Sequence, residues 1–291
     1  MSTPAASDST IAGDPEATAS LLGPPRSSTP LRGQTALVTG GAAGLGRSIA
    51  QELAAAGADV AVLDLDAKAG VAAARELQRL GVRARSYQVD VSDSARVDQA
   101  FIAVRSDFGR LDSVVNNAGI SLVGPHVKDT TDDDWLRVLA VMQTGVFYCM
   151  RAASRIMLEQ RSGSVVNISS VRGYSPNPGR ISYCAVKAAV IMMTQVAAGE
   201  WAPFGVRANA IAPGVQKTPM WDRDVLLGVC DEDKVLAVTP AGRLGQPWEV
   251  GRLAVYLCSP ESQFVNGACI SIDGGLTSVP ADGTIVRPEE S

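Results

Sequence analysis

Two residues four positions apart, Tyr183 and Lys187, form the pair in this sequence with the clearest chemical use. At this spacing in a helix, two side chains lie on the same face about one turn apart. The ordinary pKa of tyrosine, about 10, makes it a poor base at neutral pH, but a neighbouring ammonium group favours the phenolate and lowers that pKa. We therefore predict that Tyr183 exchanges a proton with an alcohol or carbonyl oxygen and that Lys187 tunes it.

A serine that precedes this pair could act on the same oxygen. Ser170 lies thirteen residues before Tyr183, at the end of a predicted strand, and could donate a second hydrogen bond to the reacting oxygen. Ser169 is the competing candidate, and the spacing from Tyr183 favours Ser170. The only histidine, His126, leaves a histidine-based metal cage or a Ser-His-Asp triad with a single candidate, so we predict no metal site.

A run of small residues follows the first predicted strand. Its motif positions are Thr39, Gly40, Gly44, Leu45 and Gly46. Glycines between a strand and a helix let the backbone approach a pyrophosphate at the helix N-terminus. Taken alone, the run fits a nucleotide site and a plain tight turn about equally well, because three residues separate Gly40 from Gly44, unlike the G-x-G-x-x-G fingerprint.

Asp64 lies at the carboxyl end of the second predicted strand, eighteen residues after Gly46. A carboxylate at this position can accept hydrogen bonds from both hydroxyls of an adenosine ribose. It would repel the 2′-phosphate of NADP, and Ala43 in the glycine turn is not basic, so we predict NAD as the cofactor. The alternative is a solvated aspartate at a strand end.

These residues need a scaffold, and short β-branched runs alternate with helix-period segments from Thr35 onward. The alternation is typical of βαβ units and predicts an α/β fold: a single Rossmann-like, doubly wound domain over residues 31–278, with helices on both faces of a parallel sheet. Seven strands are expected, at Thr35–Thr39, Val60–Leu65, Ser86–Val89, Ser113–Val115, Ser164–Ile168, Arg207–Ile211 and Cys269–Ile272. Two long helices are expected at Thr131–Gln160, which opens with a capping-box-like segment, and at Ser182–Phe204.

Composition argues against several other classes of protein. The 291 residues are 46% apolar and 19% charged, which suits a globular chain. A net charge of −4 argues against a nucleic-acid partner, and the longest stretch without Asp, Glu, Lys or Arg, Ser113–Val127, is too short to cross a membrane. Five cysteines without a C-x-x-C pair fit a reducing cytoplasm better than disulfides or zinc. Residues 1–30 are expected to form a disordered leader, and residues 279–291 a C-terminal tail.

Taken in order along residues 31–278, these motifs resemble the short-chain dehydrogenase/reductase family. The matching elements are the glycine turn Thr39–Gly46, Asp64, Asp90-Val91, Asn116-Asn117-Ala118-Gly119, Ser170, Tyr183-x-x-x-Lys187, Asn209-Ala-Ile-Ala-Pro213-Gly214, Thr218 and Asp273-Gly274-Gly275. The resemblance implies hydride transfer between NAD(H) and a secondary alcohol or ketone, with Tyr183 as acid/base, Ser170 fixing the substrate oxygen and Lys187 also binding ribose hydroxyls. It implies further cofactor contacts from Leu65 beside Asp64, Asp90 and Val91 at the adenine, Asn117, Ala118 and Gly119 at the ribose, and Pro213, Val215, Gln216 and Thr218 at the nicotinamide and phosphates.

One position departs from the family pattern. A W-x-x-V-L-x-V-N segment normally supplies an asparagine as a fourth catalytic residue, but here Trp135-Leu-Arg-Val-Leu-Ala-Val141 is followed by Met142. That asparagine is described as shaping the helix so that a main-chain carbonyl holds a water linked to the lysine. Met142 is compatible with a working enzyme that has an altered relay, with a slow or substrate-restricted one, and with a cofactor-binding protein of other chemistry or none. It could also pack beside the substrate.

Residues 215–242 resemble the family's substrate-covering lid, which sets specificity. Apolar side chains of this lid could line a pocket or pack the lid onto the body: Met220, Trp221, Leu226 and Leu227. No arginine cluster indicates an acidic substrate, although Arg172 could reach the mouth of the site, so the partner is predicted only as a small alcohol or ketone.

Competing hypotheses are an NAD-binding scaffold and a non-redox catalyst of cyclisation or dehydration. Apolar residues around the two long helices, which pair between subunits in the resembling family, predict a homodimer or homotetramer.

Overall fold

The structure is a computed structural model that describes residues 28–120 and 126–278. The expected C-terminal tail and nearly all of the expected leader lie outside the described residues. Within them the chain forms a seven-stranded parallel sheet with the order β3-β2-β1-β4-β5-β6-β7. The strands are β1 (Thr35–Thr39), β2 (Asp59–Asp64), β3 (Ala84–Gln88), β4 (Ser113–Asn116), β5 (Gly163–Ile168), β6 (Val206–Pro213) and β7 (Cys269–Ile272).

All seven predicted strands are confirmed, with shifts of one or two residues at several of their ends. The first and last strands have the predicted bounds. β6 continues two residues past Ile211, because it lies between β5 and β7 and pairs with β7 as far as Pro213 opposite Ile272. β1 is buried at every position, as expected for a parallel strand covered on both faces.

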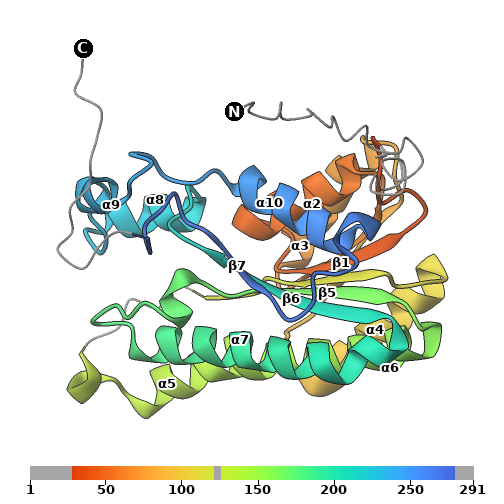
Figure 1. The fold of residues 1–291 in the computed structure, drawn as a ribbon, viewed down its shortest axis with the longest axis horizontal. Helices are drawn as coiled ribbons and strands as arrows, with labels where there is room; N and C mark the ends of the chain where they lie inside the picture. The colour runs from red at the N-terminus through yellow and green to blue at the C-terminus, as the bar shows by residue number, and fades with distance from the viewer. Residues whose placement is uncertain (1–27, 121–125, 279–291) are drawn as a thin grey trace, which may run out of the picture.

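Helices cover both faces of the sheet, which gives the expected doubly wound α/β fold (Figure 1). One face carries α2 (Gly44–Ala55), α3 (Ala67–Gln78) and α10 (Pro247–Cys258), and the other carries α4 (Ser94–Phe108), α5 (Asp132–Leu139), α6 (Gly145–Gln160) and α7 (Ile181–Trp201). Each face has its own apolar core, with Ile49 in the first and Phe101 in the second. β1 supplies Val38 to one core and Leu37 to the other, because successive side chains of a strand point to opposite faces.

The long helix predicted at Thr131–Gln160 is continuous but changes its winding. A π-helical turn, Ala140–Thr144, joins α5 to α6. Thr131 caps the helix as predicted, because its hydroxyl accepts a hydrogen bond from the Asp134 amide (3.1 Å). Single π turns inside α-helices are frequent at functional sites, and this one contains Met142.

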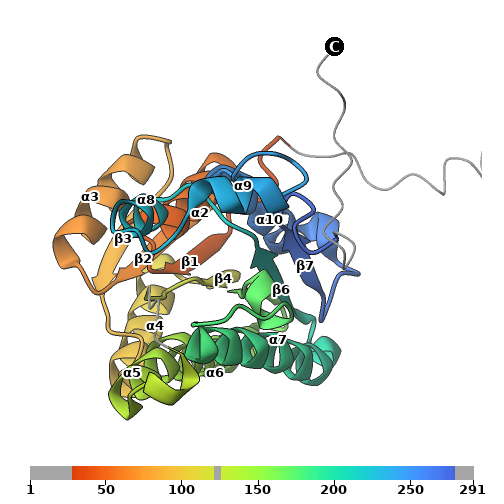
Figure 2. The ribbon, with the colours of Figure 1, turned by 90° about the vertical axis from the view of Figure 1, so that its left-hand side faces the viewer.

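The carboxyl ends of the strands lie at the end of the molecule that also holds α8 (Pro219–Leu226) and α9 (Glu232–Val238) (Figures 1 and 2). These two short helices form part of the segment predicted as a lid. β1 and β4 are neighbours in the sheet although β2 and β3 lie between them in the chain. Ligands of doubly wound sheets bind at such a switch point, beyond the carboxyl ends of the strands.

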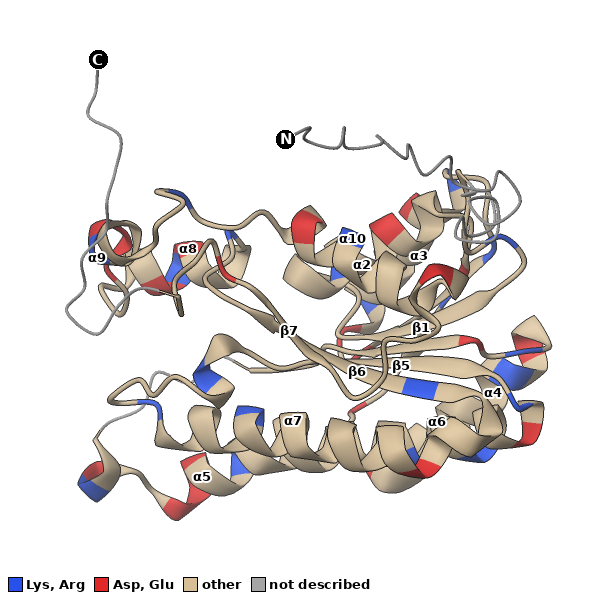
Figure 3. Ribbon diagram, in the orientation of Figure 1, with Lys and Arg blue, Asp and Glu red and all other residues tan. Residues whose placement is uncertain are grey.

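Helix α7 carries an apolar surface that a single chain leaves exposed. Lys187 and Glu200 are its only charged residues, and its ribbon is nearly free of charge in Figure 3. With the turn that follows, residues Ile181–Phe204 are the one helical segment in the described part of the chain that is long and apolar enough to span a membrane. The helix packs along β6, yet Met192 and Val196 remain 59% and 53% exposed.

We expect this surface to join copies of the chain, so that light scattering at micromolar concentration gives the mass of a dimer or tetramer. Replacing Met192 and Val196 together by Glu places charges against the partner copy and is expected to shift the mass toward that of a monomer. Ile102→Glu, at an apolar position of α4 that is 69% exposed, is the control and should leave the mass unchanged. A monomeric wild-type protein would contradict the expectation.

Candidate active site

Ser170, Tyr183 and Lys187 lie together beyond the carboxyl end of β5. Ser170 is 6% exposed, and its hydroxyl lowers the pKa of the Tyr183 phenol against the larger, opposite effect of burial. Lys187, one turn further along α7, is 5% exposed. Its Nζ donates to the Ile168 main-chain oxygen (2.7 Å) and lies 5.6 Å from the centre of the Tyr183 ring. β5 and α7 thus bring the three candidate catalytic side chains to one place.

Ser169, the competing serine, is used in the structure for a different contact. Its hydroxyl donates to the main-chain oxygen of Lys187 (2.8 Å), which ties the end of β5 to α7. The Ser170 hydroxyl accepts a hydrogen bond from the Arg172 amide (3.1 Å) and faces the phenol. The geometry therefore favours Ser170 as the residue that contacts a substrate oxygen.

Burial dominates the electrostatics of this cluster. It raises the pKa of Tyr183 above its ordinary value and outweighs the opposing effects of the Ser170 hydrogen bond and of the positive charges on Arg180 and Arg172. Burial also lowers the pKa of Lys187 to about 8. The expected lowering of the Tyr183 pKa is therefore wrong as a net effect. At neutral pH Tyr183 is protonated, the form that can donate a proton to a carbonyl oxygen.

The glycine turn after β1 leaves open space at the start of α2. Gly44 has a left-handed backbone (φ +52°), and a side chain added there would meet nothing within 4 Å. The N-cap residue, Ala43, offers no side-chain hydrogen bond to the first amides of the helix. Gly46 is required by packing instead, since a Cβ there would overlap the Gly40 oxygen. An open helix N-terminus without a side-chain cap suits a phosphate, so these residues fit the pyrophosphate of a dinucleotide.

Asp64 ends β2 and is held against this turn. Its Oδ2 accepts a hydrogen bond from the Ala42 amide (3.0 Å), and its Oδ1 accepts one from the Asp66 amide (3.1 Å). The carboxylate is thus oriented by the backbone rather than freely solvated, and each oxygen keeps a lone pair for a ribose hydroxyl. The next residue, Leu65, is 65% exposed beside it.

Thr39 and the segment from Asn117 join the ends of β1 and β4. The Thr39 hydroxyl accepts hydrogen bonds from the amides of Asn117 (2.9 Å) and Ala118 (3.0 Å). The side-chain amide of Asn117 donates in turn, through Nδ2, to the main-chain oxygens of Thr39 (3.0 Å) and Gly40 (3.2 Å). These bonds shape the switch point, and Gly119 just beyond them is exposed. The segment therefore has a structural role, which is compatible with the ribose contact expected from the resemblance.

The loop after β6 is bound to its neighbours through main-chain contacts. The Val215 oxygen accepts a hydrogen bond from the Gly245 amide (3.0 Å), and Gln216 pairs with Gly245 in a parallel bridge. The Gln216 side chain is turned toward β7, where its Nε2 donates to the Ile272 oxygen (3.5 Å). Thr218 caps α8 through its hydroxyl. Contact of this loop with the nicotinamide or the phosphates of a cofactor stays a prediction.

The remaining predicted cofactor contacts have packing or capping roles in the structure. The Asp90 carboxylate accepts hydrogen bonds from the Ser92 amide (2.9 Å) and hydroxyl (2.6 Å). Val91 is buried against Gly145, and Pro213 is buried at the end of β6. Contact of these residues with a cofactor stays a prediction.

Comparison with known proteins agrees with this arrangement. A family model described as Enoyl-(Acyl carrier protein) reductase matches residues 40–277. The chain is 36% identical over 254 residues to 2-(S)-hydroxypropyl-CoM dehydrogenase 3 of Xanthobacter autotrophicus, a match that covers 86% of this chain and 98% of that protein. The chain belongs to the short-chain dehydrogenase/reductase family.

Other short-chain dehydrogenases/reductases are similarly close. The chain is 37% identical over 246 residues to 3-oxoacyl-[acyl-carrier-protein] reductase of Thermotoga maritima, covering 84% of this chain and 98% of that one. The crystal structure of an NAD⁺-bound xylitol dehydrogenase matches with a TM-score of 0.81 at 33% identity, covering 84% of this chain and 99% of that one. The protein is accordingly an oxidoreductase of this family.

In this short-chain dehydrogenase/reductase, Met142 is buried in an apolar cluster. It is 4% exposed and lies with Val138 and Val186, against which Tyr183 also packs. Its Cε is 3.1 Å from the place that a Cβ on Gly119 would occupy. The π-helical turn forms with methionine at this position, so the altered winding does not require an asparagine. The contacts favour a packing role for Met142 between α7 and the end of β4.

Met142→Asn is expected to destabilise the protein by about 1–3 kcal/mol, because an amide would be buried among apolar side chains without a partner. Met142→Leu, which conserves volume, is expected to cost less than about 1.5 kcal/mol. Thermal unfolding of the two variants measures the difference. The Asn variant is also expected to show no gain in turnover. A several-fold gain with little change in KM would instead show that a missing water relay limits the enzyme.

One residue near this site, Arg180, was not among the residues predicted from the sequence. Arg180 is the N-cap of α7, three residues before Tyr183. Its Nη2 donates to the Cys230 sulfur (3.4 Å), in the loop between α8 and α9, so it joins α7 to the segment predicted as a lid. A basic residue one turn before the tyrosine was the available signal.

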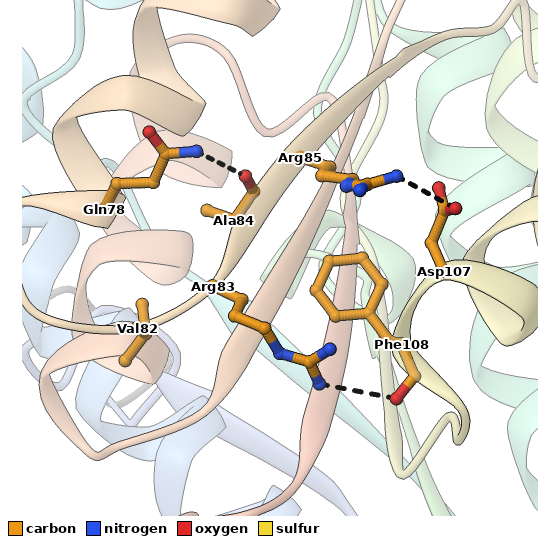
Figure 4. Close-up of a pocket in the computed structure, with 7 residues that line it drawn as sticks. All are labelled: Gln78, Val82, Arg83, Ala84, Arg85, Asp107 and Phe108. Atoms are coloured by element: carbon orange, nitrogen blue, oxygen red, sulfur yellow. Dashed lines mark hydrogen bonds and ion pairs between the residues drawn. The ribbon is translucent and has the colours of Figure 1, made fainter.

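A cavity of about 360 Å³ lies away from this site, at the amino end of β3 (Figure 4). It is lined by Gln78, Val82, Arg83, Ala84, Arg85, Asp107 and Phe108. Arg85 already pairs with Asp107 (2.9 Å), and Arg83 donates to the Phe108 oxygen (3.4 Å). Across residues 28–120 and 126–278, no group of three or more His, Cys, Asp or Glu side chains is arranged to hold a metal ion.

Proposed function

We propose that this short-chain dehydrogenase/reductase uses NAD(H) to interconvert a secondary alcohol and a ketone. The observation that carries the proposal is the clustering of Ser170, Tyr183 and Lys187 beside the switch point of the sheet. A scaffold that only binds a cofactor has no need of this arrangement. The intact cluster therefore favours an enzyme over the scaffold hypothesis, and the resemblance to dehydrogenases and reductases favours redox chemistry over cyclisation or dehydration.

In ketone reduction, the Tyr183 phenol donates its proton to the carbonyl oxygen. The Ser170 hydroxyl donates a hydrogen bond to the same oxygen and stabilises the charge that develops there. A nicotinamide bound at the site supplies or accepts the hydride at the substrate carbon. In the reverse direction the phenolate takes the alcohol proton, and because burial raises the pKa of Tyr183, alcohol oxidation is favoured by alkaline pH.

Lys187 is placed to position the cofactor and to assist Tyr183. One of its three N–H groups is used by the Ile168 oxygen, which leaves two for ribose hydroxyls or a water. With a pKa of about 8, the Lys187 amine is charged in most molecules at neutral pH. At neutral pH its ammonium group can stabilise the phenolate that forms transiently when Tyr183 gives its proton to the substrate.

The residues that would hold the dinucleotide are those of the glycine turn and Asp64. The open start of α2 at Gly44 fits the pyrophosphate, and the oriented Asp64 carboxylate fits the ribose hydroxyls. The same carboxylate disfavours the 2′-phosphate of NADP, which supports NAD.

The proposal is tested by titrating the protein with NADH and with NADPH, followed by a panel of secondary alcohols and ketones monitored at the nicotinamide absorbance. NADH is expected to bind more tightly, and at least one alcohol or ketone is expected to change the absorbance. Binding of NADH with no turnover across a broad panel would support the scaffold hypothesis instead.

A further inference from the structure

Two arginines flank the proposed catalytic residues. Arg172 lies two residues after Ser170, and Arg180 lies three residues before Tyr183. Both side chains are half-buried. Arg172 belongs to the short 3-10 turn Val171–Gly173, which packs against α7, and its amide donates to the Ser170 hydroxyl (3.1 Å). Arg180 is the N-cap of α7, one turn before Tyr183. Both positive charges also lower the pKa of Tyr183 against the larger effect of burial.

Neither guanidinium group has an oxygen partner in the part of the chain that the structure describes. Six arginines there are half-buried, and the other four each donate to an oxygen: Arg47 to Glu76, Arg105 to Gln160, Arg151 to Ser94 and Arg207 to the Leu257 main chain. Arg180 contacts only the Cys230 sulfur, which is a weak acceptor. The Arg172 side chain makes no hydrogen bond or ion pair with a described residue.

Four of the five acidic residues of the neighbouring lid form ion pairs with basic residues of the lid itself, and Asp231 pairs with Lys234 (3.1 Å). Lys217 pairs with Asp222 (3.0 Å) and Glu232 (3.4 Å), and Arg223 pairs with Asp224 (3.2 Å). Within the described residues, no acidic side chain of the lid forms an ion pair with Arg172 or Arg180. A partly buried cation without a paired anion is unfavourable, and a guanidinium group forms two parallel hydrogen bonds with an oxyanion.

We propose that Arg172 and Arg180 bind a carboxylate or similar oxyanion of the substrate, next to the alcohol or ketone that reacts at Tyr183. This inference rests on the proposed function and narrows it to acidic substrates. It differs from the expectation that no arginine cluster indicates an acidic substrate. Seven residues separate the two arginines in the sequence, and the packing of α7 against the turn that follows β5 places both beside the proposed catalytic residues.

The test compares keto acids with their uncharged methyl esters: 3-oxobutanoate, 4-oxopentanoate and 5-oxohexanoate, each reduced with NADH. For at least one chain length, kcat/KM is expected to be about 10- to 100-fold higher for the acid, the range of a charge-assisted pair of hydrogen bonds. Arg172→Met and Arg180→Met, singly and together, are expected to remove most of this preference while activity on the ester persists. Arg85→Met, which removes a paired arginine of the remote β3 edge, is the control and should leave the preference unchanged.

Several results would overturn the inference. Equal wild-type activity on acids and esters at every chain length would do so while leaving the proposed redox function intact. If the arginine variants lowered acid and ester rates equally, the two residues would only tune Tyr183. If no compound of the series turns over, calorimetry measures the binding of the same acids and esters to the complex of the protein with NADH. Tighter binding of the acid than of the ester, lost in the double variant, supports the inference. Equal binding of acid and ester overturns it.

Discussion

Replacing Tyr183 by Phe is expected to lower turnover by about 10²- to 10⁴-fold, the usual effect of losing a general acid or base. The substitution removes only the phenolic oxygen and keeps the ring that packs against the cluster of Met142. Cofactor binding is therefore expected to persist, and the loss should fall on kcat rather than on the affinity for NADH. Steady-state kinetics and a parallel NADH titration separate the two effects.

Tyr87→Phe is the matched control for this variant. The Tyr87 hydroxyl is hydrogen-bonded to Asp107 (2.7 Å) on the far edge of the sheet, so removing it tests the loss of a tyrosine hydroxyl away from the site. Its turnover is expected to match that of the wild type. Unchanged turnover in Tyr183→Phe, in contrast, would mean that Tyr183 is not the acid/base and that the redox mechanism fails.

Asp64→Asn is expected to have the second largest effect, on the choice between NADH and NADPH. A carboxylate near the 2′-phosphate of NADPH is expected to penalise its binding by about 1–3 kcal/mol, or about 10- to 100-fold in Kd. Asparagine keeps an acceptor oxygen for the Ala42 amide but loses the charge, so the gap between the two Kd values should narrow. Calorimetric titration of both variants with both cofactors measures this gap.

Asp66→Asn is a suitable control, because Asp66 is a nearby carboxylate whose function is to cap α3. It should change the two Kd values equally or not at all. Equal or tighter binding of NADPH by the wild-type protein would refute the NAD preference and leave the fold and the catalytic cluster unaffected.

The sequence predicted the scaffold well because buried parallel strands have few alternatives. The bounds of Thr35–Thr39 and Cys269–Ile272 are those of β1 and β7, since β-branched runs flanked by turn residues are distinct from the helical segments around them. The candidate catalytic cluster was predictable for a similar reason. The spacing between Tyr183 and Lys187 fixes a helical face, and Ser170 marks the end of a strand.

Other properties of the site depend on packing and could not be predicted from spacing. The pKa of Tyr183 is raised because burial outweighs the nearby positive charges, a balance that sequence alone does not give. The π-helical turn around Met142 depends on how one helix fits two neighbours. The role of Arg180 depends on the lid that it contacts.

Deuterium transfer tests the central claim most directly. The protein is incubated with a ketone and NADH that carries deuterium at both C4 positions, and the alcohol product is analysed by mass spectrometry and NMR. The account predicts one deuterium on the carbinol carbon of the product, formed by the wild-type protein and strongly reduced with Tyr183→Phe. Product that forms without deuterium at that carbon, or that forms equally well without NADH, would contradict it.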